Sequence, residues 1–392
     1  MKNVIIIGSR GYRYNYGGWE TFVTELVNNS VEKDIRFFVP YLTHDKSNHK
    51  KIKHTNNIEE VELYCKNTGF TTMFSFTIKS MNYYIDYLKK NNLKNVIVLI
   101  LGCKIGPLMP KYYKKLHNLG AKVIMNPDGL EWKRDKWNRV IKKCFKVSEK
   151  YHVKYADSVV CDSKAIKDYI DQEYNVADKT EFIAYGTYLD EKIKDVKRCE
   201  KFLKDNHMEE NNYYIYVGRF IPENNIETII SEYMASETKK KLFIITNYSK
   251  NKFYNHLKYA TEFNKDDRIV LLGPVYDREL LSYIRTKAYG YIHGHSAGGT
   301  NPSLLEALGH TKVNILFDVS YNKEVGGDSC FYFSKVKASL ARMINICDEL
   351  DKKEINKLGK ECIERIKKYY TWPIIVDKYD EVFNKILNSV EK

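Results

Sequence analysis

The sequence predicts an α/β protein made of two Rossmann-like domains in tandem, and three observations lead to this fold class. The chain has 392 residues, beyond the size at which a single hydrophobic core usually keeps growing. Short apolar runs alternate with amphipathic or charged stretches, as in parallel sheets covered by helices. A second series of apolar runs follows a charged stretch near residues 190–212. We therefore expect two sheets, with a cleft between the domains.

Five apolar runs are the expected strands of each domain. In the first domain they are 4–7, 36–39, 96–101, 122–125 and 158–161, and in the second 213–217, 241–246, 269–272, 288–293 and 313–317. The charged, glycine-poor stretch 191–211 is the expected linker or the first helix of the second domain. After Pro373, aromatic and aliphatic residues recur at helical spacing, which predicts a packed terminal helix.

Composition limits the environment and the partners of the chain. The net charge of +14 indicates an acidic partner, which can be nucleic acid, an anionic membrane surface or a phosphorylated substrate. The eight cysteines are scattered singly, so we expect reduced thiols and no zinc site. Every apolar run is too short to span a membrane, and the first leads directly into a glycine turn instead of a cleavage site. A cytoplasmic protein is expected.

Two glycine-containing segments precede expected helices. Gly8, Gly11, Gly17 and Gly18 lie in a loop before a helix that begins near Glu20, where backbone amides can approach an anion. This loop differs from the compact dinucleotide fingerprint, and a loop without a ligand remains an alternative. The second segment is richer in small residues and open amides, and so predicts an anion site at a helix N-terminus. It comprises Gly298, Gly299, Thr300, Asn301, Pro302 and Ser303.

Charged side chains accompany these segments. Glu306 lies one turn into the helix after Ser303, where its carboxylate can accept hydrogen bonds from ribose hydroxyls or form a capping box with Ser303. Arg219 follows an expected strand at its carboxyl end and suits bidentate phosphate contact. Asn224 and Asn225 can bind a ligand or cap a helix. Asp128 also follows an expected strand, where a simple Asp-Gly turn is the alternative.

In this order the segments resemble the family-4 retaining glycosyltransferases, and more closely their bacterial rhamnosyltransferase branch, which makes β-1,4 linkages in capsule and cell-wall polysaccharides. The resemblance covers nearly the whole chain. It rests on GSRG and NYGGWETF within 8–22, DGLEWKRDKW at 128–137, VGRFIPENN at 217–225, GGTNPSLLEA at 298–307 and YTWPIIVDKYDEVF at 370–383.

The resemblance implies the GT-B fold, with the C-terminal helix returning to the N-terminal domain. The acceptor-binding domain would comprise residues 1–192 and 373–392, and the nucleotide-sugar-binding domain residues 193–372. The implied catalytic residues are Asp128, Arg219 and Glu306. The implied donor site comprises Gly17, Gly18, Arg219, Asn224, Gly299, Thr300, Asn301, Pro302, Ser303 and Glu306. The implied acceptor site comprises Glu20, Asp128, Glu131, Trp132 and Arg134.

Three positions depart from the pattern of the wider family. Gly298 replaces the first glutamate of its Glu-x7-Glu pattern, which makes a deoxysugar such as the rhamnose of dTDP-rhamnose easier to accommodate. Asn224 stands where a lysine is usual, so Arg219 and the amides of Gly18 and of 301–303 would carry the leaving-group charge. Asp128 stands where a histidine is common.

The implied reaction is hexosyl transfer by front-face displacement, in which the departing phosphate oxygen helps to deprotonate the acceptor. No Asp-x-Asp motif is present, so neither a metal nor another cofactor is expected. The expected acceptor is a lipid-linked saccharide. The basic, aromatic stretch 133–154 is either a solvated helix face or a contact with anionic lipid at the inner face of the cell membrane.

Three other functions stay open. A transferase that uses a UDP-hexose differs only in its donor. An NAD(P)-binding oxidoreductase shares tandem Rossmann sheets but has the compact glycine fingerprint, which this chain lacks. A nucleic-acid-binding protein would fit the charge. However, the cations are spread over both halves and no recognised motif is present, so we expect no nucleic-acid partner.

Overall fold

The computed structural model of the chain describes residues 1–14, 17–31, 33–48, 52–55, 57–134, 137–189 and 192–389. Six residues of the motifs and the charged stretch discussed above, Asn15, Tyr16, Asp135, Lys136, Asp190 and Glu191, lie outside the described residues. The chain divides into two compact units, Met1–Tyr185 with Trp372–Lys392, and Gly186–Thr371. The boundaries of the structural units thus fall after residues 185 and 371, where the sequence placed them after 192 and 372.

The first unit is built on an eight-stranded sheet with the order β3-β4-β2-β1-β5-β6-β7-β8. Neighbouring strands are parallel except for β3, which is antiparallel to β4. The strands are β1 (Lys2–Ile7), β2 (Ile35–Thr43), β3 (Ile52–Thr55), β4 (Ile58–Tyr64), β5 (Val96–Leu101), β6 (Ala121–Asn126), β7 (Ser158–Cys161) and β8 (Thr180–Phe182).

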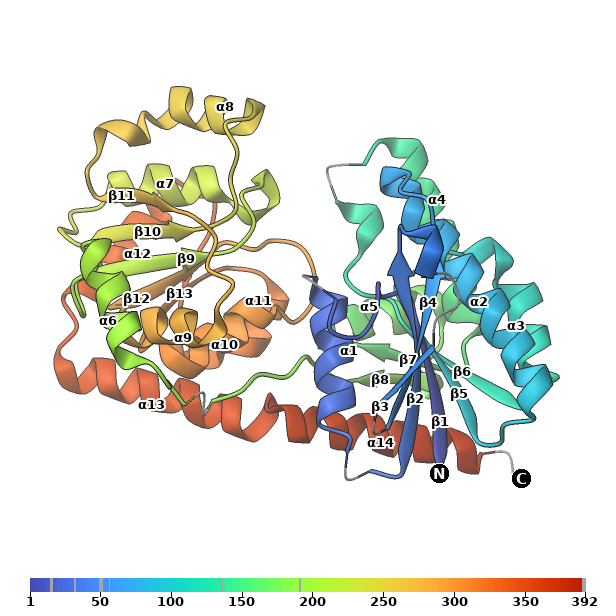
Figure 1. Cartoon of the computed structure of the whole chain (residues 1–392). Helices are drawn as coiled ribbons and strands as arrows, with labels where there is room; N and C mark the ends of the chain where they lie inside the picture. The colour runs from blue at the N-terminus through green and yellow to red at the C-terminus, as the bar shows by residue number, and fades with distance from the viewer. Residues whose placement is uncertain are drawn as a thin grey trace. The chain divides into compact units, whose positions relative to one another are not determined.

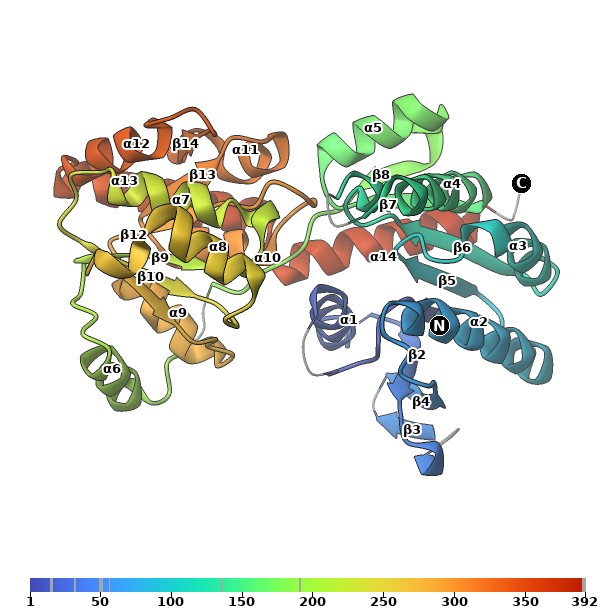
Figure 2. The same ribbon diagram turned by 90° about the horizontal axis from the view of Figure 1, so that it is seen from above.

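Helices cover both faces of this sheet (Figure 2). Side chains from α2 to α5 pack on one face, where Phe76 and Met109 share a core with Val98 and Ile100. The other face carries α1 and α14. The helices are α1 (Gly18–Asn28), α2 (Thr72–Asn91), α3 (Met109–His117), α4 (Arg139–Tyr155), α5 (Lys164–Tyr174) and α14 (Trp372–Asn388). Burial on both faces explains why the central strands are continuous apolar runs that the sequence reveals.

The second unit is built on a six-stranded parallel sheet with the order β11-β10-β9-β12-β13-β14. The strands are β9 (Tyr213–Val217), β10 (Lys241–Ile245), β11 (Ile269–Leu272), β12 (Gly290–His293), β13 (Val313–Phe317) and β14 (Phe331–Phe333). The helices are α6 (Val196–Asp205), α7 (Ile226–Met234), α8 (Lys252–Thr261), α9 (Arg278–Lys287), α10 (Pro302–His310), α11 (Ser320–Gly326), α12 (Ser339–Asp348) and α13 (Lys352–Tyr369). In Figure 1, α7 and α8 lie above this sheet, and α9 and α10 lie below it.

All ten predicted strands are present, and among the described residues the sequence missed four others, β3, β4, β8 and β14. Five predicted strands have the same limits in the structure, those at 96–101, 158–161, 213–217, 269–272 and 313–317. Strand β4 was hidden by its three glutamates, which are buried in the fold. One of them, Glu59, pairs with Arg36 of β2 at 2.8 Å, which offsets the cost of burying its charge. An acidic strand of this kind lacks the apolar pattern that identified the others.

The terminal helix α14 packs on the first unit, as the sequence predicted. Tyr379 of α14 lies 5.3 Å from the ring of Phe22 in α1, and its hydroxyl accepts a hydrogen bond from Asn126 at 3.5 Å. Lys2 pairs with Asp380 at 2.6 Å. Helix α14 therefore packs against the same unit as the first strand of the chain.

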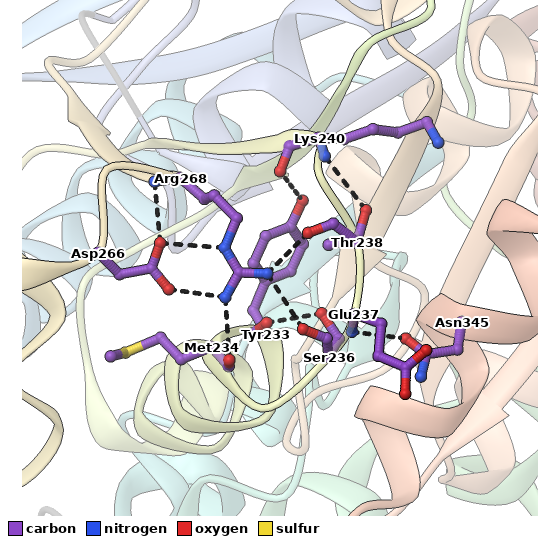
Figure 3. Close-up of polar contacts among 9 residues, drawn as sticks. All are labelled: Tyr233, Met234, Ser236, Glu237, Thr238, Lys240, Asp266, Arg268 and Asn345. Carbon is purple, nitrogen blue, oxygen red and sulfur yellow. Dashed lines mark hydrogen bonds and ion pairs between the residues drawn. The ribbon is translucent and has the colours of Figure 1, made fainter.

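A single arginine secures the end of α7 and the turn into β10 (Figure 3). The guanidinium of Arg268 donates to the carbonyls of Met234, Ser236 and Thr238 at 2.9, 3.1 and 2.7 Å. It also holds Asp266 by two hydrogen bonds at 3.0 and 2.7 Å. The last carbonyls of a helix have no partner within the helix and attract positive charge, so this contact satisfies both needs.

We predict that Arg268→Ala lowers the free energy of unfolding of this unit by roughly 2 kcal/mol, because it leaves Asp266 and three carbonyls without their donor. Urea denaturation followed by circular dichroism measures this loss. The matched control is Lys265→Ala, which removes an exposed ion pair with Glu262 in the same turn and should change stability by less than about 0.5 kcal/mol. Equal losses in the two variants would contradict the role of Arg268.

Candidate functional site

In the second unit, the loop that follows β9 is joined by hydrogen bonds to the segment that follows β12. The side-chain amide of Asn225 donates to the carbonyl of Gly294 at 2.8 Å. The backbone amide and the hydroxyl of Ser296 both donate to the carbonyl of Glu223, at 3.2 and 2.7 Å. Because parallel strands end at the same edge of a sheet, these bonds gather two predicted donor-binding segments there.

The N-terminus of α10 is shaped by Asn301, which is its N-cap. The side-chain oxygen of Asn301 accepts from the amide of Ser303 at 3.0 Å, and its carbonyl accepts from Leu304 at 3.0 Å. Pro302 has no N–H. The backbone amides of 301–303 were predicted to bind phosphate. Pro302 therefore cannot contribute one, and the amide of Ser303 is already hydrogen-bonded to Asn301. The helix dipole still favours an anion at this end, next to the buried Gly299 and Thr300.

Glu306 forms an ion pair instead of a capping box. Its Oε2 lies 2.7 Å from Nη2 of Arg285 in α9, whose side chain is 2% exposed, whereas that of Glu306 is 38% exposed. The hydroxyl of Ser303 donates to the carbonyl of Val217 at 3.1 Å. Since Asn301 is the cap, Glu306 lies beyond the capping-box position, and that alternative is wrong. Arg285 fixes the carboxylate while part of it stays accessible.

Arg219 is exposed at the end of β9, and two hydrogen bonds fix its backbone carbonyl. Its carbonyl accepts from the side-chain amide of the buried Asn224 at 2.9 Å and from the hydroxyl of Tyr216 at 3.2 Å. Asn224 thus positions the arginine through the backbone. Asn225 precedes α7 in the left-handed conformation, with φ of 53°, and its side chain bonds Gly294 rather than capping the helix.

Two buried histidines beside these segments were not predicted from the sequence. The rings of His293 and His295 stack with centroids 4.4 Å apart. Nδ1 of His293 lies 2.8 Å from the hydroxyl of Tyr291, which is 3.2 Å from that of Ser303. Burial, with a smaller contribution from Arg219, lowers the pKa of His295 to about 3, so this ring is neutral near pH 7. The signal in the sequence was the HGH at the end of β12, directly before the glycine segment.

In the first unit, the glycine loop encloses a carboxylate. Glu20, in the first turn of α1, is buried, and its Oε1 accepts from the amide of Arg10 at 2.9 Å. A Cβ atom on Gly17 would lie 1.7 Å from Oε2 of Glu20, so only glycine fits at that position. Glu20 therefore already places a negative charge at the N-terminus that Gly17 and Gly18 were predicted to offer to the donor.

A cavity of about 360 Å³ opens at the carboxyl ends of β1, β5 and β6 in this unit. The predicted acceptor residues Asp128, Glu131 and Trp132 line it. Glu20 and Arg134 are not among its lining residues, but they pair with Arg10 and Glu131, which are. Its full lining is Arg10, Trp19, Gly69, Phe70, Met73, Phe74, Gly102, Cys103, Lys104, Pro127, Asp128, Gly129, Glu131, Trp132, Trp137, Phe145 and Glu149.

Asp128 and Lys104 bring opposite charges to this cavity. Asp128 adopts the left-handed conformation with φ of 65°, and its amide donates to the side chain of Asn126 at 3.0 Å. Burial raises the pKa of the Asp128 carboxyl, although Arg134 opposes this effect. Burial also lowers the pKa of Lys104, whose amine donates to the carbonyls of Leu101 and Gly8 at 3.0 and 3.2 Å. Lys104 was not predicted from the sequence, although it lies just after an expected strand.

Hydrogen bonds fix the tryptophans of the cavity. Glu131 accepts from the indole of Trp137 at 2.8 Å and pairs with Arg134 at 2.6 Å. The indole of Trp132 donates to Glu149 at 3.2 Å. The carboxylate of Glu149 is buried and also accepts from two tyrosine hydroxyls, those of Tyr169 at 2.6 Å and Tyr174 at 2.7 Å. The rings therefore hold set orientations in the wall.

The described residues offer neither a metal-binding cluster nor a membrane-spanning helix. No group of three or more histidine, cysteine, aspartate or glutamate side chains suited to a metal ion occurs among them. Within that part of the chain, each helix is also too short or too polar to cross a bilayer.

Comparisons with known proteins bear on the fold. Residues 1–188 match the family model described as Domain of unknown function (DUF1972). No curated protein matches the sequence. Sucrose-phosphate synthase (tll1590) from Thermosynechococcus elongatus is similar in structure, with a TM-score of 0.82 and 16% identity over 99% of this chain and 100% of its own.

Two other solved structures are also similar. A glycosyltransferase from Rickettsia africae ESF-5 has a TM-score of 0.73 and 15% identity over 98% of each chain. Anabaena Alr3699/HepE in complex with UDP has a TM-score of 0.72 and 13% identity over 98% of this chain and 100% of its own. At these identities the likeness establishes the fold alone. The chain has the GT-B fold that its sequence predicted.

Proposed function

We propose that this chain is a retaining glycosyltransferase that transfers L-rhamnose from dTDP-rhamnose to a lipid-linked saccharide in the synthesis of a bacterial surface polysaccharide. The observation that carries the proposal is the linked pair of loops in the second unit. They hold Arg219 and the N-terminus of α10 at one edge of the sheet, and the Arg285–Glu306 pair lies one turn into that helix. A diphosphate needs positive potential, and the deoxyribose of dTDP needs a fixed acceptor for its free hydroxyl.

Proteins that share the fold support a nucleotide-sugar donor. One solved neighbour, Anabaena Alr3699/HepE, is in complex with UDP and glucose. Others are a sucrose-phosphate synthase and a UDP-forming α,α-trehalose-phosphate synthase. These names favour a UDP-hexose as the second candidate donor.

Catalysis in this proposal is electrostatic. Arg219 and the α10 dipole stabilise the negative charge that develops on the departing diphosphate. That phosphate oxygen takes the proton of the acceptor hydroxyl while the new glycosidic bond forms on the same face of the sugar. A protein nucleophile is not required. Asp128 and Lys104 orient the acceptor in the cavity of the first unit.

The choice of a deoxysugar is supported by Gly298. A Cβ atom there would have no neighbour within 4 Å, but the φ of 120° disfavours any residue other than glycine. The carboxylate that the wider family carries at this position therefore has no equivalent in this chain. A donor sugar with fewer hydroxyls to satisfy suits such a site.

The donor assignment is tested with dTDP-rhamnose, UDP-glucose, UDP-N-acetylglucosamine and GDP-mannose in separate reactions, each with a lipid-linked N-acetylglucosamine or glucose acceptor. We expect mass spectrometry to detect the gain of one deoxyhexose with dTDP-rhamnose alone. A gain of one hexose would contradict the donor, and no transfer from any nucleotide sugar would contradict the proposed function.

We predict that Glu306→Gln weakens dTDP binding about 10- to 100-fold, because a charged acceptor for the 3′-hydroxyl of the deoxyribose is lost. Arg285→Met should weaken binding about tenfold, since the carboxylate loses the partner that orients it. The double variant should bind no more weakly than Glu306→Gln alone, because Arg285 acts through Glu306. Isothermal titration calorimetry gives the three dissociation constants.

The matched control for these variants is Arg268→Met in the same unit. It removes another arginine that pairs with a carboxylate, yet this arginine binds the end of α7 and serves the fold (Figure 3). It should lower stability and leave dTDP binding unchanged. If the losses of dTDP affinity in the two single variants add in the double variant, Arg285 binds the nucleotide independently of Glu306.

We also propose that the first unit contacts anionic lipid through α4. Along one face of this helix, Val140 and Val147 are 72% and 40% exposed, and Lys143, Lys150 and Lys154 are exposed beside them. Mixed apolar and cationic groups on one helix face favour the surface of an anionic bilayer.

In sedimentation with vesicles, the wild type should bind those with anionic lipid and not neutral ones. Lys143→Glu with Lys150→Glu should reduce anionic binding at least tenfold, at about 1 kcal/mol or more for each lysine. Lys239→Glu with Lys258→Glu, which makes the same charge change at exposed sites of the second unit, is the control. Equal recovery on both vesicle types would contradict the contact.

A further inference from the structure

One wall of the cavity in the first unit is a cluster of four aromatic rings, Phe70, Phe74, Trp137 and Phe145, which we call the aromatic cluster. The ring of Phe70 lies 4.6 Å from that of Trp137 and 5.2 Å from that of Phe74. Phe145 lies 5.6 Å from Trp137 and 6.3 Å from Phe74. The rings come from the turn before α2, α2 itself, the segment before α4 and α4, so distant parts of the chain converge to build this wall.

The aromatic cluster is partly open. The side chain of Phe70 is 48% exposed, and Phe74, Trp137 and Phe145 are each half-buried. The indole N–H of Trp137 is already bonded to Glu131. The neighbouring lining residues Gly69 and Met73 have no hydrogen-bonding side chain other than the weakly accepting thioether of Met73. This wall therefore offers apolar surface to a ligand and few side-chain hydrogen bonds.

The other side of the cavity, at the strand ends, carries charged groups. Arg10, Lys104 and Asp128 follow β1, β5 and β6 and bring charged groups to the same cavity. A ligand that fills the cavity thus meets hydrogen-bonding groups at the sheet edge and aromatic carbon at the α2 and α4 side. Such a lining matches a molecule with one polar end and one apolar end.

We infer that the aromatic cluster binds the apolar aglycone of the acceptor, the first part of the lipid attached to its saccharide. This inference rests on the proposed function and assigns a subsite within it. A second sugar ring at this wall would leave hydroxyl groups buried without partners, which costs free energy. An alkyl or prenyl chain removes apolar surface from water on both sides of the contact, which is favourable.

The tryptophans allow a direct binding test that does not need enzyme activity. Three of the four tryptophans of the chain, Trp19, Trp132 and Trp137, line the cavity. Intrinsic fluorescence is titrated with octyl glucoside below its critical micelle concentration and with methyl glucoside. We expect octyl glucoside to bind at least about tenfold more tightly, since two or more buried methylenes account for that factor.

Two substitutions assign the effect to the aromatic cluster. Phe70→Ser and Phe74→Ser should each remove most of the preference for octyl glucoside and leave methyl glucoside binding unchanged. Both side chains are outside the buried core, so the variants should unfold near the wild-type temperature. Tyr259→Ser in α8 of the second unit is the matched control, because that tyrosine is 89% exposed and distant in the fold.

The outcomes separate this inference from the proposed function. Equal binding of the two glucosides, or tighter binding of a methyl disaccharide than of octyl glucoside, would overturn the inference. So would an octyl preference that persists in both phenylalanine variants. If the preference is present and depends on Phe70, but no sugar is transferred from any nucleotide sugar, the subsite stands and the proposed function fails.

Discussion

The carboxyl edge of a parallel sheet is the constraint on which the rest of this structure depends. Parallel strands end side by side, so loops far apart in the sequence meet there and must satisfy one another. In the second unit they do so through Asn225 and Gly294, and through Ser296 and Glu223. These bonds place Arg219 and the start of α10 together at this edge.

The two units stabilise buried charged side chains in different ways. In the second, Arg285 neutralises Glu306 across two helices, and the pair leaves one side of the carboxylate accessible. In the first, Lys104 and Asp128 both line the cavity. Burial lowers the pKa of Lys104 and raises that of Asp128. Burial penalises the charged form of each group, so each stays charged most easily when the other is near. The cavity therefore favours ligands that are polar at this end.

The fold was largely predictable from the sequence because both faces of each sheet are covered by helices. Central strands such as β5 and β9 then appear as continuous apolar runs, and five predicted strands have the observed limits. Strand β4 was missed because its glutamates are buried through contacts, such as that of Glu59 with Arg36, that a sequence pattern does not contain. The sequence placed the boundary between the domains after residue 192, whereas the first structural unit ends at Tyr185. A charged linker and a charged first helix have the same composition, so the sequence does not distinguish them.

For the site, the sequence by itself determined which segments end at the sheet edges, because apolar runs followed by glycine, asparagine and charged residues mark these positions. It thereby supplied Arg219, Glu306 and Asp128. Only the tertiary structure decided what these groups contact. That Arg285 pairs with Glu306, that His293 stacks on His295, and that four aromatic rings form one wall of a cavity all depend on residues brought together by packing. Periodicity reports the face that a residue occupies, whereas its partners come from other elements and are fixed by the fold.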